Sequence, residues 1–376
     1  MNAGIDKALI IGGGFAGMTA AARLARQGVE VDLLEIDPGW RSYGAGISLH
    51  GSTLRVLNEL GLLHRFMEEG FASDGVQIRG PDDRILVTLP TPRVAGPDVP
   101  GGGGIMRPAL AKILQEEVVA AGVNVRLGAT FSTIEDREDG VWVDIGDGSP
   151  KRYDLAIGAD GLYSRIRATL FPEAPKPRFI GQSVWRAVLP RLAEITTVTM
   201  WLGPKLKVGI NGVSTDKAYL FLTEDKEVND FVAPDTFVET LRALLRQFPS
   251  PIIQSVADQL SEENQVIYRP LEQMLMPRPW RKGRVALIGD AVHATTPHLA
   301  AGACIGIEDA MVLAQEIGRA ATVDAALAAF ETRRWERCRM VVENSGRLAD
   351  IEIHGGSREE HAAIMGASMK TLAEVI

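Results

Sequence analysis

Short apolar runs alternate with amphipathic segments along the first part of the chain. The runs 8–11, 29–34 and 155–158 have the length and composition of buried strands, whereas 18–26 and 108–121 show the apolar spacing of helices. Strands that alternate with helices in this way are typical of a parallel sheet with helices packed on it. The pattern therefore predicts an α/β domain at the start of the chain.

The pattern changes beyond Gly181, where apolar and polar positions alternate in short segments. Such alternation predicts antiparallel strands with one buried face, and an amphipathic helix over 235–247 interrupts them. The predicted strands are 184–189, 197–202, 208–211 and 218–223. The apolar strand 283–288 and a long helix over 303–320 then return to the character of the first domain.

The simplest architecture is a Rossmann-type, nucleotide-binding α/β domain with an inserted, mainly antiparallel β-sheet domain for the substrate and a C-terminal helical segment. Stretches rich in glycine and proline at 90–104, 172–181 and 277–283 separate these parts. The expected division is 1–75, 100–178 and 270–345 for the nucleotide-binding domain, 76–99 and 179–269 for the substrate domain, and 346–376 for the C-terminal helix.

Composition narrows the class of protein. A chain of 376 residues suits two or three packed modules, and its net charge of −8 disfavours nucleic acid and anionic membranes as partners. No apolar run approaches the ~18 residues of a membrane span, and the N-terminus lacks a secretion signal. Cys304 and Cys338, the only cysteines, supply neither a disulfide framework nor a metal cluster. We expect a cytoplasmic protein, monomeric or homodimeric, that binds small molecules and no metal.

The turn between the first strand and the first helix carries the clearest ligand signal. Gly12 permits a tight turn, Gly14 lets the backbone approach a pyrophosphate, and Gly17 lets the helix pack closely on the strand. The phosphates would meet the free N–H groups at the start of the helix. Glu35 ends the next strand, where a carboxylate accepts from ribose hydroxyls and opposes a 2′-phosphate. This order of elements predicts a dinucleotide site.

A second ligand signal follows the strand 283–288, which ends in Gly289-Asp290. Ligands of open α/β sheets bind outside the carboxyl ends of the strands, so Asp290 is placed to contact the same ligand. Four arginines lie further on in a helical stretch, which we interpret as a basic, solvated face over a domain seam. They are Arg333, Arg334, Arg337 and Arg339.

Three motifs thus follow one another in a fixed order. They are Gly12 to Gly17 with Glu35, then Asp160 to Arg167, and then Gly289-Asp290 with His293, Pro297 and Gly302. Together they resemble the FAD-dependent aromatic hydroxylases, the single-component flavoprotein monooxygenases typified by p-hydroxybenzoate hydroxylase. The resemblance covers about residues 7–345 and implies a glutathione-reductase-like Rossmann fold with bound FAD.

The resemblance also implies which residues hold FAD. The peptide groups of Phe15 and Ala16 would face the pyrophosphate, and Glu35 would bind the adenosine ribose. Arg41 and Arg107 would lie near the phosphates and the ribityl chain.

The later motifs would contact the other end of the cofactor. Asp290 would accept from ribityl hydroxyls, and the N–H groups of Gly302 and Ala303 would face the flavin ring. Asp160 would brace the two halves of the domain and shape a groove for the nicotinamide cofactor. Because the chain has one glycine turn of this kind, NADH or NADPH would bind only transiently, and the choice between them is open.

In that family FAD carries the difficult chemistry. The resemblance implies that NAD(P)H reduces the flavin, that O2 adds at C4a, and that one oxygen atom passes to an electron-rich ring carbon. The expected reaction is hydroxylation of a small aromatic or N-heteroaromatic substrate. A base that removes a proton from a ring hydroxyl would make the ring more nucleophilic, and histidine titrates in the useful range.

Four residues are candidates for contact with the substrate. His298 follows Pro297 in the loop expected to pass the flavin, and His50 lies in the segment expected to border the substrate. Arg186 would clamp a substrate carboxylate or draw in the cofactor, and Tyr219 would orient a phenolic oxygen. Each has a structural alternative. His298 could be satisfied by backbone groups, and His50 could lie at a solvated strand end. Arg186 could form an ion pair at the rim, and Tyr219 could pack in the core.

Other functions on the same fold stay open. They are an epoxidase, an isoprenoid reductase, an antibiotic-inactivating oxygenase, and a nucleotide-binding sensor without turnover. Flavin-dependent halogenases need a Trp-x-Trp signature that this chain lacks. Ser52, where asparagine is common, and the loop 300–304, usually richer in glycine, depart from the family pattern and leave the substrate class open.

Overall fold

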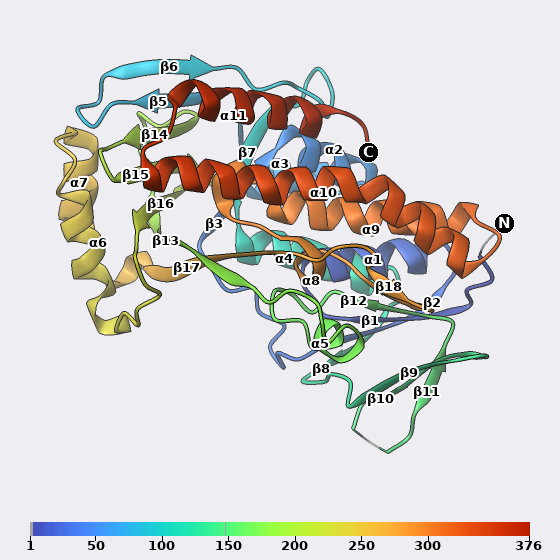
Figure 1. Cartoon of the computed structure of the whole chain (residues 1–376). Helices are drawn as coiled ribbons and strands as arrows, with labels where there is room; N and C mark the ends of the chain where they lie inside the picture. The colour runs from blue at the N-terminus through green and yellow to red at the C-terminus, as the bar shows by residue number, and fades with distance from the viewer. Residues whose placement is uncertain (1–2, 147) are drawn as a thin grey trace.

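The α/β fold expected from the N-terminal pattern is confirmed by a six-stranded sheet (Figure 1). The computed structural model describes residues 3–146 and 148–376. The strands run in the order β18 (Arg281–Lys282), β19 (Val285–Leu287), β12 (Leu155–Gly158), β1 (Lys7–Ile11), β2 (Glu30–Glu35) and β8 (Asn124–Leu127). β1 lies between β12 and β2 and is parallel to both, so the carboxyl ends of all three strands meet at one edge.

Helices cover this sheet and each other. α1 (Phe15–Arg26) packs against α4 (Arg107–Ala120) and α9 (Gly302–Arg319), and α9 packs against the long α10 (Val323–His354). The other helices of this part are α2 (Gly51–Glu59), α3 (Leu63–Glu69), α5 (Arg165–Leu170), α8 (Asp290–His293), the short η3 (Pro297–Leu299) and α11 (Arg358–Ala373). α10 and α11 lie side by side across one face of the molecule (Figure 1).

A second, seven-stranded sheet is the inserted, mainly antiparallel sheet that the alternating pattern predicts. Its order is β17 (Ile267–Leu275), β13 (Arg178–Pro190), β16 (Lys217–Asp225), β15 (Leu206–Gly212), β14 (Val198–Leu202), β5 (Val76–Arg79) and β6 (Ile85–Leu89). β5 joins it by parallel pairing with β14. The predicted helix over 235–247 is η1 (Pro234–Thr236) followed by α6 (Phe237–Leu245).

Smaller elements complete the chain. Two three-stranded sheets have the orders β11 (Lys151–Tyr153), β10 (Gly140–Asp144), β9 (Thr133–Arg137), and β3 (Gly46–His50), β7 (Gly102–Met106), β4 (Phe71–Ser73). Several short helical segments were not expected from the sequence, among them α7 (Pro251–Gln259), which Ser250 caps, and η2 (Glu262–Asn264). Residues 346–376, expected as one helix, contain the end of α10 and the separate α11, with Gly355 at a left-handed φ of +71° between them.

Each large sheet has its own hydrophobic core. One core lies around the parallel sheet, and the other packs Trp185 and Trp201 of the second sheet against Leu241 and Ile253 of α6 and α7. Along β13 the side chains alternate, so Trp185 enters that core while Arg186 belongs to the opposite face. The second sheet therefore turns a face with polar side chains away from its own core.

The interpretation of the arginine stretch as a solvated face is wrong for its central members. Arg334 is 0% exposed and Arg337 is 9% exposed. Both lie on α10 where it crosses α9, and the carboxylates of Glu308 and Asp309 on α9 pair with them. Helix crossing, which no local pattern reveals, buries these charges.

Among the described residues, the helices lack the combination of length and apolar composition that crossing a bilayer requires.

Replacement of Gly17 by alanine should destabilise the fold. A Cβ at Gly17 would lie 1.9 Å from the backbone oxygen of Gly12, so α1 would have to move away from β1. We expect the free energy of unfolding to fall by about 2 kcal/mol or more, measured by denaturant unfolding. Gly14→Ala is the matched control, because nothing lies within 4 Å of a Cβ at that position. Equal stability of the two variants would contradict the expected clash.

Candidate active site

The glycine turn closes as the sequence predicts. Gly12 has a φ of +111°, and a Cβ there would meet the Ala159 oxygen at 2.2 Å, so only glycine fits. Gly14 precedes α1 as its N-cap, and neither a side-chain cap nor an acidic residue occupies the first turn of that helix. The open space beside Gly14 therefore lies next to uncapped N–H groups, which suits a phosphate.

Glu35 is held at the rim of this turn. Its two carboxylate oxygens accept hydrogen bonds from the backbone N–H of Gly13 at 2.7 Å and of Asp37 at 2.8 Å. The indole Nε1 of Trp40 donates to the Gly13 oxygen at 3.0 Å and closes the turn from the other side. The carboxylate is thus fixed in place and keeps lone pairs for ribose hydroxyls. Sequence reasoning missed the Trp40 contact, because a tryptophan after the second strand has no fixed partner.

The three motifs meet at the carboxyl edge of the parallel sheet. A Cβ at Gly289 would lie 3.1 Å from the Cβ of Ala16, and one at Gly306 in α9 would lie 3.4 Å from it. The guanidinium of Arg167 donates to the Ala291 oxygen at 2.7 Å and so ties the second motif to the third. These contacts bring the starts of α1, α8 and α9 together.

Asp160 accepts hydrogen bonds at the start of α5, and the bracing role that the resemblance implies stays a prediction. Its Oδ2 accepts from the N–H groups of Arg165 and Ile166 at 2.8 and 3.1 Å, at the start of α5. Its Oδ1 is buried and makes no hydrogen bond among the described residues. Arg167, which sequence reasoning quoted but did not single out, makes the bond across the two segments.

Arg107 connects the predicted cofactor residues with the predicted substrate residues. Its guanidinium lies 5.8 Å from the centre of the Phe15 ring. Burial and then the positive charge of Arg186 lower the pKa of Arg107, whereas Tyr219 and the Asp290 carboxylate act in the opposite direction. These charges therefore share one neighbourhood between the two sheets.

Arg186 and Tyr219 form a pair on the face of the second sheet that points away from its core. The Nε of Arg186 donates to the Tyr219 hydroxyl oxygen at 3.0 Å. Tyr219 itself is 7% exposed and packs with Ala45 and Val213, and its ring fills the space that a side chain on Gly46 would need. Tyr219 thus has the core packing that was one of its two alternatives, and Arg186 orients its hydroxyl group. Orientation of a phenolic oxygen of the substrate by Tyr219 stays a prediction.

The end of β19 presents a carboxylate and a helix start. Asp290 is exposed, yet loss of water around it raises the pKa of its carboxyl, an effect that His293 and Arg107 partly oppose. Gly302 and Ala303 begin α9, and no side chain caps that helix. The dipole of this helix of 18 residues favours an electron-rich group at its start.

Arg41 is paired within its own loop, and its predicted place near the FAD phosphates stays a prediction. Its side chain is 61% exposed and makes two hydrogen bonds to Asp37, at 3.0 and 2.8 Å, within its own loop. It also lies over the Tyr43 ring.

His298 and His50 both bind the segment around η3. The His298 side chain is 1% exposed, and its two nitrogens contact Thr296 Oγ1 at 2.8 Å and Gln182 Oε1 at 2.9 Å. Burial lowers the pKa of His298, although Glu352 at 3.5 Å opposes that effect. His50 Nε2 contacts the Leu299 oxygen at 2.6 Å. These contacts hold the loop around η3, and among the described residues neither histidine makes a hydrogen bond to Arg186 or Tyr219.

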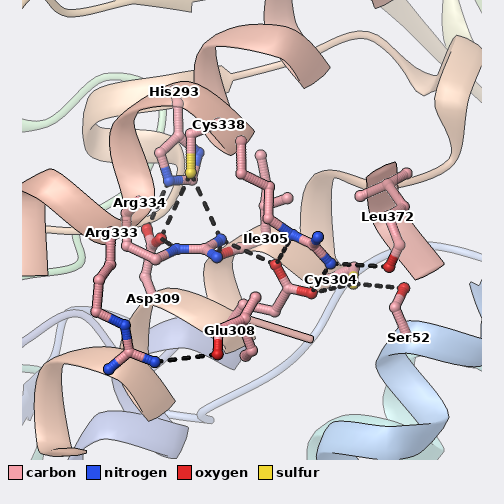
Figure 2. A network of polar contacts seen from close by, with 12 residues as sticks. Ser52, His293, Cys304, Ile305, Glu308, Asp309, Arg333, Arg334, Cys338 and Leu372 are labelled. Carbon is pink, nitrogen blue, oxygen red and sulfur yellow. Dashed lines mark hydrogen bonds and ion pairs between the residues drawn. The ribbon is translucent and has the colours of Figure 1, made fainter. Parts of the chain in front are cut away.

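A buried cluster of charges lies behind the site (Figure 2). Asp309 pairs with Arg334 and His293, and Glu308 pairs with Arg334 and Arg337. Burial opposes the charged forms, but the opposite charges prevail: they lower the pKa of Asp309 to about 2 and raise the pKa of His293 well above its usual value. Two adjacent acids in the otherwise apolar pattern of α9 indicate charge on a buried helix, but they do not reveal the arginines that pair with them.

Three members of this region place possible metal ligands within 4.8 Å of one another: His293, Asp309 and Cys338. The guanidinium of Arg334, however, already donates to Asp309 at 2.8 Å and to Cys338 at 3.5 Å. Its positive charge opposes a cation at that point.

Comparisons with known proteins agree with the geometry. A family model described as an FAD binding domain matches residues 6–345. The 3-amino-4-hydroxybenzoate 2-monooxygenase PtmB3 of Streptomyces platensis is 32% identical over 353 residues, which cover 89% of this chain and 86% of that protein. The 2-heptyl-3-hydroxy-4(1H)-quinolone synthase of Pseudomonas aeruginosa is 30% identical over 355 residues, which cover 92% and 90%.

Among solved structures, Klebsiella pneumoniae HpxO complexed with FAD and uric acid matches with a TM-score of 0.81 at 25% identity, covering 99% of this chain and 94% of that one. The fold, the order of the three motifs and these relatives lead to one assignment. The chain belongs to the family of FAD-dependent aromatic hydroxylases.

Proposed function

We propose that this protein is an FAD-dependent monooxygenase that uses NADH or NADPH and O2 to hydroxylate a small aromatic or N-heteroaromatic ring. The observation that carries the proposal is the meeting of the three motifs at one sheet edge, with Arg107 near enough to Arg186 and Tyr219 of the second sheet to feel their charges. Relatives support this class of substrate, since one is a 3-amino-4-hydroxybenzoate 2-monooxygenase and HpxO was crystallised with uric acid.

The chain offers acceptors and donors where FAD would need them. Gly14 and the uncapped start of α1 would receive the pyrophosphate, Glu35 the adenosine ribose, and Asp290 the ribityl hydroxyls. The N–H groups of Gly302 and Ala303 would face the flavin ring. When bound, FAD supplies electron transfer from the nicotinamide and the activation of O2.

The substrate would bind against Arg186 and Tyr219. Because Tyr219 accepts from Arg186, its own O–H remains available to donate to a ring oxygen. Among the described residues, neither Arg107 nor Arg186 has a carboxylate within ion-pair distance. An anionic oxygen of the ring or a ring carboxylate would supply the missing counter-charge.

Arg186 also bears on the activation of the ring. A guanidinium beside a ring hydroxyl stabilises the deprotonated oxygen. The ring of the deprotonated substrate is more nucleophilic than that of the protonated one. We therefore assign the stabilisation of this anion to Arg186 and Tyr219, and we assign to His298 and His50 the positioning of the loop 296–299.

The proposal also includes a monomeric or homodimeric protein in the cytoplasm. The two cysteines, Cys304 and Cys338, are buried free thiols, as is usual in a reducing compartment.

The first test is oxidation of NADH and NADPH under air by the FAD-loaded protein, with a panel of hydroxybenzoates, hydroxypyridines and purines. We expect at least one anionic ring compound to accelerate oxidation and to yield hydroxylated product with little hydrogen peroxide, because a seated ring excludes water from the reaction. Peroxide and product are scored together. A panel in which no ring compound accelerates oxidation refutes the proposal.

Replacement of Arg186 by glutamine should weaken binding of that ring compound. Loss of a charge-assisted hydrogen bond costs about 1.5–3 kcal/mol, so we expect KM to rise at least about tenfold. The measurement is steady-state kinetics with the accelerating substrate. Arg339→Gln is the matched control, because Arg339 is an exposed arginine of α10 that pairs with Glu336 and Glu343. An unchanged KM in Arg186→Gln would remove Arg186 from the substrate site.

The dependence of kcat/KM on pH distinguishes two roles for His298, a catalytic base and a residue that holds the loop. A base at this position would contribute an ionisation to kcat/KM, shifted to low pH because burial lowers the pKa of His298. Both of its nitrogens are engaged, so we expect His298→Asn to lower kcat while the acid limb of the profile keeps its midpoint. Disappearance of that limb in the variant would instead make His298 the base.

A further inference from the structure

The two carboxylates of the buried cluster hold different parts of the chain (Figure 2). Asp309 faces the turn that carries Asp290. Its Oδ2 accepts from the Gly289 N–H at 2.9 Å and contacts His293 Nε2 at 2.5 Å, and its Oδ1 accepts from Arg334 Nε at 2.8 Å.

Glu308 faces the C-terminal end of the chain. It accepts from Arg337 at 2.7 and 2.8 Å, and Arg337 in turn donates to the backbone oxygens of Thr371 and Leu372 at the end of α11. Its other partners are Arg334, at 3.0 Å, and the thiol of Cys304, which donates to it at 3.7 Å. The contacts of Glu308 thus hold the last helix and not the turn at Gly289.

The turn at Asp290 needs an external anchor. Gly289 has a φ of +64°, a left-handed conformation, and α8 that follows it is only four residues long. A helix of this length has little stability of its own. Oδ2 of Asp309 contacts both Gly289, the residue before Asp290, and His293, the last residue of α8. It therefore holds this segment at both ends.

We propose that Asp309 is a positioning residue for the cofactor: through the Gly289 N–H and His293 it fixes the direction in which the Asp290 carboxylate points toward FAD. This inference rests on the proposed function. Arg334 holds the remaining oxygen of Asp309 and prevents the carboxylate from rotating. The charges of the cluster persist near neutral pH, since the pKa of Asp309 is lowered and the pKa of His293 is raised.

The two carboxylates allow a matched experiment. Asp309→Asn and Glu308→Gln each remove one buried negative charge from the same cluster and keep the size of the side chain. We expect Asp309→Asn to raise the Kd for FAD at least tenfold, by titration of flavin fluorescence, and Glu308→Gln to leave that Kd within twofold. Both variants should lower Tm, because both leave a buried arginine with one carboxylate fewer.

A double variant tests whether Asp309 acts through Asp290. In the Asp290→Asn background, adding Asp309→Asn should change the Kd for FAD less than twofold, because the group that it positions is already gone. Three results would overturn the inference: an unchanged Kd in Asp309→Asn, equal rises in Kd for Asp309→Asn and Glu308→Gln, or full additivity with Asp290→Asn. Failure of the unaltered protein to bind FAD would instead refute the proposed function, so the two failures are distinguishable.

Discussion

Close contact of backbone with backbone holds the parts of this site together. Where Gly17 would carry a Cβ, the Gly12 oxygen lies 1.9 Å away, and Gly289 and Gly306 leave room for little more than the methyl group of Ala16. Each contact brings a helix start to the same edge of the parallel sheet. Uncapped N–H groups and carboxylates with unused lone pairs collect at that edge, which suits the nucleotide of the proposed function. Tight backbone packing is therefore what brings these groups together.

Each of the two large sheets has a separate hydrophobic core, and polar side chains lie where the sheets meet. Each buries its own apolar face in its own core, so the surface where they meet does not have to be apolar and can hold polar side chains. Arg107 comes from the first residue of α4 beside Phe15, while Arg186 and Tyr219 come from neighbouring strands of the second sheet. Within the described part of the chain, the guanidinium groups of Arg107 and Arg186 lack a carboxylate partner at this seam, and under the proposed function an anionic ring would supply that charge.

Burial of the charge cluster behind the site costs desolvation free energy. Taking carboxylates and guanidinium groups out of water costs several kcal/mol per ion, which only close pairing offsets. The contacts between α9 and α10 satisfy that condition and fix the positions of both helices. The two departures from the family pattern touch each other near this cluster: Ser52 Oγ lies 3.3 Å from Cys304 Sγ, and burial raises the pKa of that thiol to about 12. A small neutral pair thus fills the contact between α2 and α9.

The sequence by itself determined whatever depends on neighbours along the chain. The strand, glycine turn and helix around Gly12, the acid at Glu35 and the strand that ends in Asp290 are local patterns, and each was readable because its spacing is dictated by backbone geometry. Tertiary structure alone decided which distant groups meet. His298 contacts Gln182, which is 116 positions away in the sequence, and Arg334 is buried against Asp309. Helix and sheet packing bring these residues together. A local pattern records whether a side chain is polar, but it does not record what lies opposite, and the partner decides whether that side chain is solvated, tethered or free to act.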